Sequence, residues 1–304
     1  MHIRKAQPSD KHKILNFCQD TFAWGDYIHI VWDSWVIDHS GLLLVVDIPN
    51  SSTLIYDPVA VSHISTCPNG VLWIEGLRVN KTFRNQGIAT YLLRYMLKYG
   101  FKKGLNESCA LVSSKNVVSK RLFEKQGFSA NTICRYYNIK MGKNSQFNAH
   151  SLNFKYARIC DIECIQNYLD ASEVFSKMDG RYFNEWKFYK LKNTFDGVYD
   201  LVSKEKLVLI VDKNNKINGI SIINIIRDKD IFYSKPLLQI CYIDCLDYSI
   251  YPHFIYLILE KLGAPNQFKN IHFFAENSID LSCIFNDICI DNCEEFIIYC
   301  KKLP

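Results

Sequence analysis

One stretch of the chain combines a strand, a tight turn and a helix in an order that forms an anion site. Residues 71–79 are largely apolar, residues 80–87 carry basic and amide side chains, and residues 88–98 place apolar side chains at helical spacing. Backbone N–H groups in the first turn of a helix have no internal partners and carry the positive end of the helix dipole. Gly87 lets the backbone approach a ligand, and Arg84 adds a permanent charge. The stretch therefore predicts a pyrophosphate site.

Two common phosphate motifs do not fit these residues. A P-loop needs Gly-Lys-Ser/Thr at the helix start, and a dinucleotide fingerprint needs three glycines and a later acidic residue. The pattern Arg84-x-x-Gly87-x-Ala89 has neither. A simpler alternative is a helix that follows a tight turn and binds nothing.

A second motif lies downstream and favours the ligand site. Residues 107–112 read as a strand, Asn116 follows, and residues 119–128 read as a short helix that Gly127 ends in a left-handed conformation. Together the two motifs resemble those of the GNAT superfamily of N-acyltransferases, over roughly the first 140 residues. The downstream positions that match are Asn116, Leu122, Phe123, Glu124, Lys125, Gly127 and Phe128.

The resemblance implies an α/β (α+β) fold, in which a mixed, mostly antiparallel central sheet is flanked by helices. The order of elements in the first half agrees with it, including a hairpin turn at Cys67-Pro-Asn-Gly70. The elements expected there are a strand over residues 3–6, a helix over residues 11–22, and strands over residues 42–46, 59–65 and 71–79.

The second half repeats this pattern in eroded form. Strands are expected over residues 154–157, 206–212, 217–224, 240–246, 271–275 and 295–300, with helices over residues 161–169 and 250–262. Asp244 takes the place of Glu75, but no Arg-x-x-Gly-x-Ala precedes the helix at residue 250. We therefore expect tandem GNAT-like domains, residues 1–144 binding acetyl-CoA and residues 150–304 degenerate, joined by the polar segment 142–149. The alternative is an unrelated helical or mixed C-terminal domain.

Acetyl-CoA is the cosubstrate that the resemblance implies. The strand end would pair with pantetheine like an added strand, and a bulge at Gly76 would point an N–H at the thioester oxygen. Asn116 would hold the pantetheine arm. The cofactor-binding residues expected are Leu77, Arg78, Val79, Arg84, Asn85, Gln86, Gly87, Ile88, Ala89, Thr90, Asn116, Ser119 and Phe123.

Glu75 is the predicted catalytic residue, because it lies on the central strand just before the cofactor contacts. There it could take a proton from an ammonium, directly or through water. The alternative is a structural ion pair with Arg78 or Lys81. Many GNAT enzymes carry a tyrosine at the position of Phe123, to protonate the leaving thiolate. Phenylalanine has no proton to give, so another group (Tyr91, Ser119 or water) would serve, or the thiolate would leave unaided.

The acceptor amine is expected to bind near Asp26 and Tyr27, with Glu75 beside it. Aromatic and acidic side chains in residues 24–38, which include Trp24, suit a cation, although Trp32 and Trp35 are expected to pack into the core. The same run also resembles the branch of GNAT proteins that includes vertebrate histidine N-acetyltransferase. That implies acetylation of the primary amine of an amino acid or similar small molecule. A protein or peptide N-acetyltransferase and a non-catalytic acyl-CoA-binding module are the alternatives.

Composition and charge narrow the possible partners and the location of the protein. Net charge is +5 over 304 residues without a basic block, so a nucleic-acid partner is not expected. No apolar run reaches the roughly 20 residues of a membrane span, and the N-terminus has no signal-peptide core, so a cytoplasmic protein is expected. Twelve cysteines without a C-x-x-C pair are expected to be reduced and to bind no metal. Whether the chain is a monomer or a homodimer is not readable from the sequence.

Overall fold

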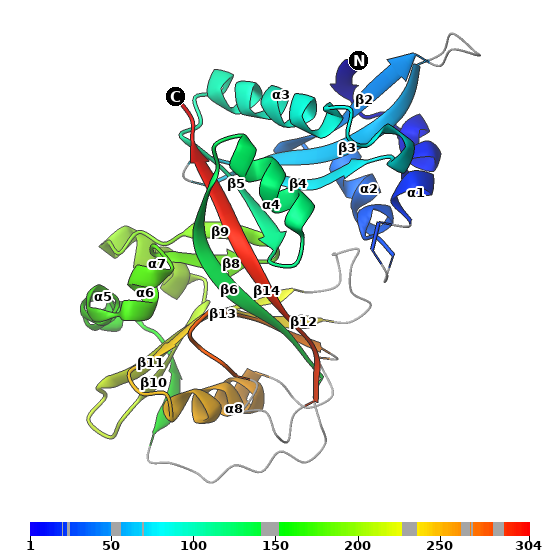
Figure 1. Cartoon of the computed structure of the whole chain (residues 1–304). Coiled ribbons are helices and arrows are strands. Elements are labelled where there is room, and N and C mark those ends of the chain that lie inside the picture. Colours follow the sequence, from blue (N-terminus) through cyan, green and yellow to red (C-terminus); the bar gives the residue numbers. More distant parts are fainter. Residues whose placement is uncertain are drawn as a thin grey trace. The chain divides into compact units, whose positions relative to one another are not determined.

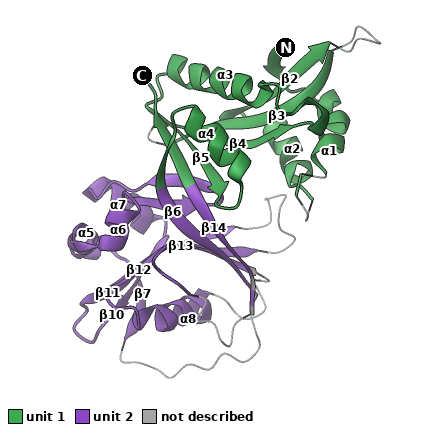
Figure 2. Ribbon diagram, viewed as in Figure 1, with its two compact units in different colours: residues 1–131, 298–304 green, residues 132–297 purple. Residues whose placement is uncertain are grey.

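The structure, a computed structural model, divides into two compact units (Figure 2). Unit 1 comprises residues 1–131 and 298–304, and unit 2 comprises residues 132–297. The linker predicted at residues 142–149 lies outside the described residues. The structure describes residues 1–19, 21–22, 25–49, 56–68, 70–140, 152–226, 236–262, 268, 270–281 and 289–304.

Unit 1 is a sheet in the order β1-β2-β3-β4-β5, followed by the end of β14 (Figure 1). Strands β1 to β4 pair antiparallel, and β4 and β5 pair parallel. The elements are β1 (His2–Lys5), α1 (Lys11–Cys18), α2 (Ile28–Val36), β2 (Gly41–Pro49), β3 (Tyr56–Cys67), β4 (Val71–Val79), α3 (Ile88–Lys102), β5 (Glu107–Ser113), α4 (Val117–Lys125) and β14 (Cys289–Lys302), with 3-10 turns at Pro8–Asp10 and Lys81–Phe83.

The core of unit 1 follows the apolar pattern of these elements. Helix α2 buries Trp32 and Trp35 in a cluster with Leu43 and Val45 of β2, as the sequence predicts. Helix α3 packs on β3, β4 and β5. The first helix ends at Cys18, four residues earlier than predicted, because the backbone N–H and the hydroxyl of Thr21 both donate to the Cys18 carbonyl and turn the chain.

Unit 2 has a sheet in the order β6-β13-β12-β11-β10-β7, with β14 beside β6. The predicted strands and the helix at residue 250 are present. A helix, a hairpin and a second helix between residues 173 and 203 were not predicted. The elements are β6 (Ser129–Lys140), β7 (Asn153–Tyr156), α5 (Ile162–Ala171), α6 (Glu173–Lys177), β8 (Arg181–Asn184), β9 (Lys187–Lys190), α7 (Phe195–Ser203), β10 (Leu207–Val211), β11 (Ile217–Ile226), β12 (Leu237–Cys245), α8 (Ile250–Leu262) and β13 (Asn270–Glu276), with a 3-10 turn at Ile159–Asp161.

Two strands belong to both units. Strand β6 begins in unit 1 and continues into unit 2 after Asn131, and β14 begins in unit 2 and enters unit 1 at Ile298. The last residues of the chain therefore complete the sheet that its first residues begin.

Candidate active site

The start of α3 has the form that the sequence predicts for an anion site. Gly87 is the N-cap residue with φ 79°, and the first backbone bond of the helix runs from the Tyr91 N–H to the Gly87 carbonyl. The N–H groups of residues 88–90 therefore precede the bonded part of the helix. A Cβ built at Gly87 would meet nothing within 4 Å, so the turn borders open space.

The turn before α3 is held by its own side chains. Asn80 Oδ1 accepts the Thr82 N–H at 3.2 Å, and Arg84 Nε donates to the Val79 carbonyl at 3.0 Å. Arg84, Asn85, Gln86 and Gly87 are exposed, whereas the Ile88 side chain is buried in the core. Of Ile88, only the backbone could therefore contact a cofactor. Ala89 and Thr90 are half-buried in the first turn.

Strand β4 carries the predicted bulge. His63 pairs with Glu75 and Val61 pairs with Arg78, so Gly76 and Leu77 lie opposite one residue, Ser62. Gly76 has φ 65°, and a Cβ there would collide with the Trp35 ring, which only glycine avoids. The Ser62 hydroxyl donates to the Glu75 carbonyl at 3.0 Å.

Strand β4 separates from its parallel neighbour after Ile74, just before the bulge. Within the described chain the β4–β5 ladder runs from Val71–Glu107 to Ile74–Ala110, whereas β4 continues to Val79 and β5 to Ser113. The backbone of residues 75–79 thus leaves a strand-edge position that an extended ligand could occupy. Leu77, Arg78 and Val79, three of the expected cofactor residues, lie there.

Glu75 lies next to a buried histidine. Its Oε1 is 2.9 Å from Nδ1 of His63, and Nε2 of His63 is 3.1 Å from Oδ2 of Asp38. The His63 side chain is fully buried, whereas the Glu75 side chain is 15% exposed. The imidazole stacks on the Trp35 ring, with centroids 4.5 Å apart. Glu75 and Asp38, both partly exposed, thus lie on either side of a fully buried histidine.

Asp26 and Tyr27 surround Arg78. The Arg78 guanidinium donates to Asp26 Oδ2 at 2.7 Å and lies over the rings of Phe22 and Tyr27, at 4.9 and 5.3 Å from their centroids. Asp26 also accepts the Ile28 N–H at 3.1 Å and is buried. Burial raises the pKa of Tyr27 to about 12, so its hydroxyl stays protonated. Asp26 therefore already binds a cation, the Arg78 guanidinium of the chain itself.

A hollow of about 460 Å³ borders Asp26. It is lined by residues of α1 and α2 and of the segment between them, which are His12, Leu15, Asn16, Cys18, Gln19, Gly25 and His29. Trp24, named from the sequence as a binding aromatic, lies outside the described residues.

Helix α4 carries the downstream motif. Asn116 is its N-cap, and Oδ1 accepts the Ser119 N–H at 3.0 Å. Phe123 is buried against Phe128 and against Tyr299 of β14, whose hydroxyl donates to Glu124 Oε1 at 2.7 Å. Asn116 therefore has a capping role as well as any role toward a ligand.

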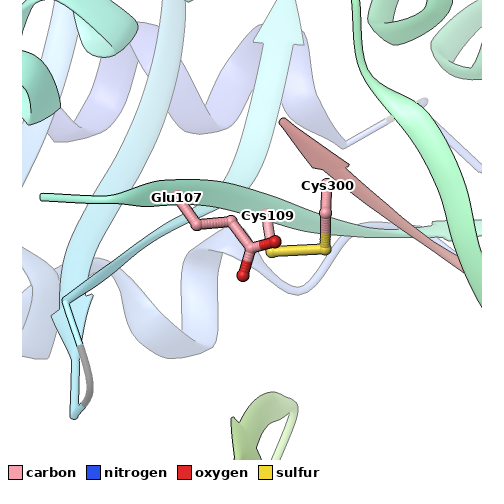
Figure 3. Close-up of side chains that lie close together, drawn as sticks. All are labelled: Glu107, Cys109 and Cys300. Atoms are coloured by element: carbon pink, nitrogen blue, oxygen red, sulfur yellow. A yellow bond between two sulfur atoms is a disulfide. The ribbon is translucent and has the colours of Figure 1, made fainter. Parts of the chain in front are cut away.

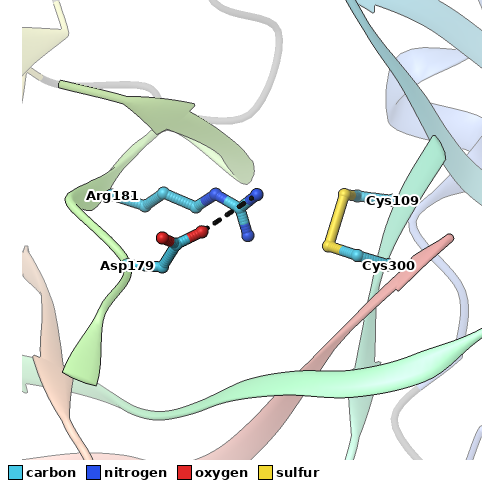
Figure 4. The surroundings of a disulfide bond; sticks show 4 residues. All are labelled: Cys109, Asp179, Arg181 and Cys300. Carbon is cyan, nitrogen blue, oxygen red and sulfur yellow. Dashed lines mark ion pairs between the residues drawn. A yellow bond between two sulfur atoms is a disulfide. The ribbon is translucent and has the colours of Figure 1, made fainter. Parts of the chain in front are cut away.

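Two of the cysteines expected to be reduced form a disulfide, so that prediction is wrong for Cys109 and Cys300 (Figure 4). The end of β14 lies beside β5, which brings the Cα atoms of Cys109 and Cys300 to within 4.3 Å of each other. Glu107 completes a group whose ligand atoms lie within 4.8 Å of one another (Figure 3). A cysteine binds a metal ion as a thiolate, and a disulfide has no thiolate. Cys109 and Cys300 therefore cannot bind a metal ion while they form the bridge.

His63 is a residue of this cluster that was not predicted from the sequence. A signal for it was available, because counting back from the Cys67–Val71 turn pair along the hairpin places His63 directly opposite Glu75. Asp38 belongs to the acidic side chains of residues 24–38 that were expected to suit a cation, but its contact with His63 was not predicted, because that contact depends on how the segment after α2 returns to β2.

None of the described helices is both long and apolar enough to cross a membrane.

Comparison with known proteins agrees with this geometry. Residues 11–128 match the family model "Acetyltransferase (GNAT) family". The aminoglycoside N(6′)-acetyltransferase type 1 of Salmonella typhimurium is 26% identical over 76 residues, which are 25% of this chain and 52% of the relative. The chain thus spans about half the length of the curated relatives that it matches.

Two solved structures match nearly the whole chain. A GCN5-related N-acetyltransferase from Sphaerobacter thermophilus matches with a TM-score of 0.61 and 12% identity over 99% of this chain and 95% of that one. A "putative acetyltransferase" from Thermoplasma acidophilum matches with a TM-score of 0.57 and 17% identity over 99% of this chain and 100% of that one. At this identity they establish the fold, a tandem GNAT architecture that includes unit 2. Residues 11–128, which match the GNAT family model, hold the strand, turn and helix described above.

Proposed function

We propose that the chain transfers an acetyl group from acetyl-CoA to the primary amine of a small molecule or amino acid, by direct attack in a ternary complex. The observation that carries this proposal is the combination of the α3 N-terminus, the bulged end of β4 and Glu75 on the same strand. Acetyl-CoA supplies the acyl group as an activated thioester. The remaining requirements fall to residues of this chain.

Cofactor binding is assigned to the end of β4 and the start of α3. The diphosphate would accept hydrogen bonds from the backbone N–H groups of residues 87–90, and the Arg84 guanidinium would lie nearby. The pantetheine arm would lie along residues 77–79 as an added strand, and Asn116 would hold it from the other side. Ser119 and Phe123 of α4 would line the same arm.

Glu75 is assigned as the general base. An acceptor amine is an ammonium ion at neutral pH and must lose a proton before it can attack. The partly exposed carboxylate of Glu75 would take that proton, and an N–H of the bulge at Gly76 and Leu77 would stabilise the charge that develops on the carbonyl oxygen. Phe123 gives no proton, so Tyr91, Ser119 or water would protonate the thiolate, or it would leave as such.

The acceptor is proposed to be a small amine that enters beside Asp26 and Tyr27. The hollow next to Asp26 has the volume of a small-molecule site. The resemblance to histidine N-acetyltransferase-like proteins favours an amino acid, and the aminoglycoside-acetylating relative favours a polyamine-like acceptor. The alternative of a non-catalytic acyl-CoA-binding module rests on Phe123.

Two measurements test the proposal. Calorimetric titration with CoA should give saturable binding, and the Gly87→Val variant, whose side chain would project into the open turn, should lose it. Thiol release from acetyl-CoA should then be screened with free amino acids, an aminoglycoside, polyamines and peptides. Transfer to peptides alone would favour the protein N-acetyltransferase alternative, and binding without transfer to any amine would leave the acyl-CoA-binding module.

A further inference from the structure

A buried histidine between two carboxylates lies directly behind the proposed base. His63 has Glu75 on its Nδ1 side at 2.9 Å and Asp38 on its Nε2 side at 3.1 Å, and its side chain is fully buried. Trp35 covers one face of the ring, with the two ring planes 6° apart. Tyr27 interacts electrostatically with Glu75 and also with Asp26 and Arg78, which form the neighbouring ion pair.

Hydrogen-bond bookkeeping restricts where the protons are. An ionised carboxylate accepts only, and a neutral imidazole has one donor and one acceptor nitrogen. For Glu75 to be ionised and bonded, Nδ1 of His63 must carry a proton. The other contact then holds a further proton, either on Nε2 of His63 or on Asp38.

The surroundings of Asp38 place that second proton on His63. Oδ1 of Asp38 accepts the backbone N–H of Ser40 at 2.8 Å and its hydroxyl at 2.7 Å. Hydrogen bonds donated to a carboxylate favour its ionised form. The face of Trp35 against the imidazole also favours a cation.

The chain is shaped to allow this contact. A Cβ built at Gly41 would collide with Oδ2 of Asp38 and with the backbone carbonyl of Ile64, and it would lie 2.8 Å from Nε2 of His63. Any other residue at position 41 would therefore displace the Asp38 side chain or push β2 away from β3. Gly41 has an ordinary backbone conformation in the strand, so close approach is what requires glycine here.

We propose that Asp38 and His63 are positioning residues for the base, with His63 doubly protonated and donating to both carboxylates. The cation holds Oε1 of Glu75 in one orientation, and it favours the ionised form of Glu75 on which proton abstraction depends. The other oxygen of Glu75 takes the proton from the acceptor. When that proton leaves to water, Glu75, His63 and Asp38 return to their resting charges. This inference rests on the proposed role of Glu75.

The test compares Asp38→Asn with Asp33→Asn. Asp33 lies on α2 in an exposed ion pair with Lys11. Asp33→Asn therefore removes the same charge as Asp38→Asn, but at a residue that contacts neither His63 nor Glu75. An asparagine amide can donate to Nε2, which makes His63 neutral while Nδ1 still donates to Glu75. We expect Asp38→Asn to lower kcat by about tenfold to 10²-fold, to leave the Kd for CoA unchanged, and to move the acidic limb of the kcat/KM profile to higher pH. Asp33→Asn should match the wild type in all three. An unshifted limb in Asp38→Asn overturns the proposal.

A second measurement does not depend on turnover. Nitrogen-15 NMR of the His63 ring should show both nitrogens protonated at pH 7 in the wild type and one in Asp38→Asn. A singly protonated ring in the wild type overturns the proposal whatever the catalytic result. A doubly protonated ring in a protein that acetylates no amine would instead refute the proposed function and leave the hydrogen-bond assignment standing.

Discussion

Strands β4 of unit 1 and β12 of unit 2 occupy matching places in their sheets, and each carries one acid. Glu75 lies in the middle of β4, is partly exposed, pairs with the buried His63 and precedes a glycine bulge. Asp244 lies at the end of β12 and is buried, and its Oδ2 accepts the Ser172 hydroxyl at 2.5 Å and the Tyr242 hydroxyl at 3.3 Å.

The two acids do not occupy the same strand position, although the sequence suggested that they do. The Ser62 hydroxyl donates to the Glu75 carbonyl, and the Ser221 hydroxyl donates to the Tyr242 carbonyl, so Tyr242 stands in β12 where Glu75 stands in β4. Asp244 is satisfied by hydrogen bonds within its own unit, whereas Glu75 contacts a buried histidine and stays partly exposed.

The backbone at the strand end differs in the same sense. In unit 2 the Cys245 N–H donates to the hydroxyl of Tyr251, a buried residue of α8, and every residue of β12 is buried. In unit 1 an exposed turn with a left-handed glycine precedes α3. Strand and helix alone thus do not make a site. Strand β12 has a register shift of its own at Cys241, so a bulge alone is not sufficient either. The glycine turn and a strand end that no aromatic side chain fills are also needed.

The largest effect expected from this contrast is on turnover. Glu75→Gln removes the base and should lower kcat by about 10²- to 10⁴-fold while CoA affinity stays the same. Asp244→Asn should leave kcat unchanged, because that acid is enclosed by Ser172 and Tyr242. Steady-state kinetics with the best acceptor from the screen makes the comparison. Equal losses in both variants would mean that the two acids are not functionally different.

A second difference is covalent. Loss of the Cys109–Cys300 bridge should destabilise unit 1 by about 2–5 kcal/mol, because the bridge restrains its unfolded chain. Hydrogen exchange should show the loss in β5 and the end of β14 and not in β10 and β11. Cys164→Ser, which changes an exposed free cysteine, is the control. Equal deprotection of both units would indicate that they unfold as one.

A third, smaller effect distinguishes a loss of CoA affinity from the stability cost of backbone strain. Gly87 and Gly104 have φ values of 79° and 70°, and a Cβ at either meets nothing within 4 Å. Alanine at either position should cost stability by about 1 kcal/mol. Only Gly87→Ala should weaken CoA binding, by about tenfold or 1.4 kcal/mol. Equal CoA affinities in the two variants, by calorimetry, would remove the α3 N-terminus from the site.

The smallest effect concerns the pH dependence of unit 2. Burial raises the pKa of Asp244 above its ordinary 3.8, and the Ser172 and Tyr242 hydrogen bonds only partly offset this. The folded state therefore binds the proton more tightly, and stability falls as pH rises from about 4 through the raised pKa. Asp244→Asn should abolish this component, so wild type loses stability relative to the variant between pH 4 and pH 7. Parallel melting-temperature profiles would contradict the burial argument.

Local signals made much of unit 1 predictable. The bulge at Gly76 and the glycine before the helix at Gly87 each depend on a few consecutive residues, and both are present. The N-cap role of Asn116 was not predicted, because the helix begins two residues earlier than expected. In unit 2 the hairpin of β8 and β9 was not predicted, because its anchors are distant. Glu185 exchanges two hydrogen bonds with the Gln239 side chain, and Phe183 stacks on Phe274.

Contacts between distant residues account for what was missed in the site. Cys109 and Cys300 are 191 residues apart, and their pairing depends on where β14 ends. Asp26 and Arg78 are also far apart, and an acid expected to bind a ligand is bonded to an arginine of its own unit. Neither the composition nor the spacing of these residues indicates the pairing.

The path of β14 has a consequence for biosynthesis. A ribosome completes residues 1–131 long before it reaches residues 298–304, so the leading unit leaves the exit tunnel without its final strand. Its nascent form would present an unpaired β5 edge, and Cys109 would have no bridging partner until Cys300 has been synthesised. Premature stop codons upstream of residue 298 should therefore impair unit 1, far from the lesion in the gene.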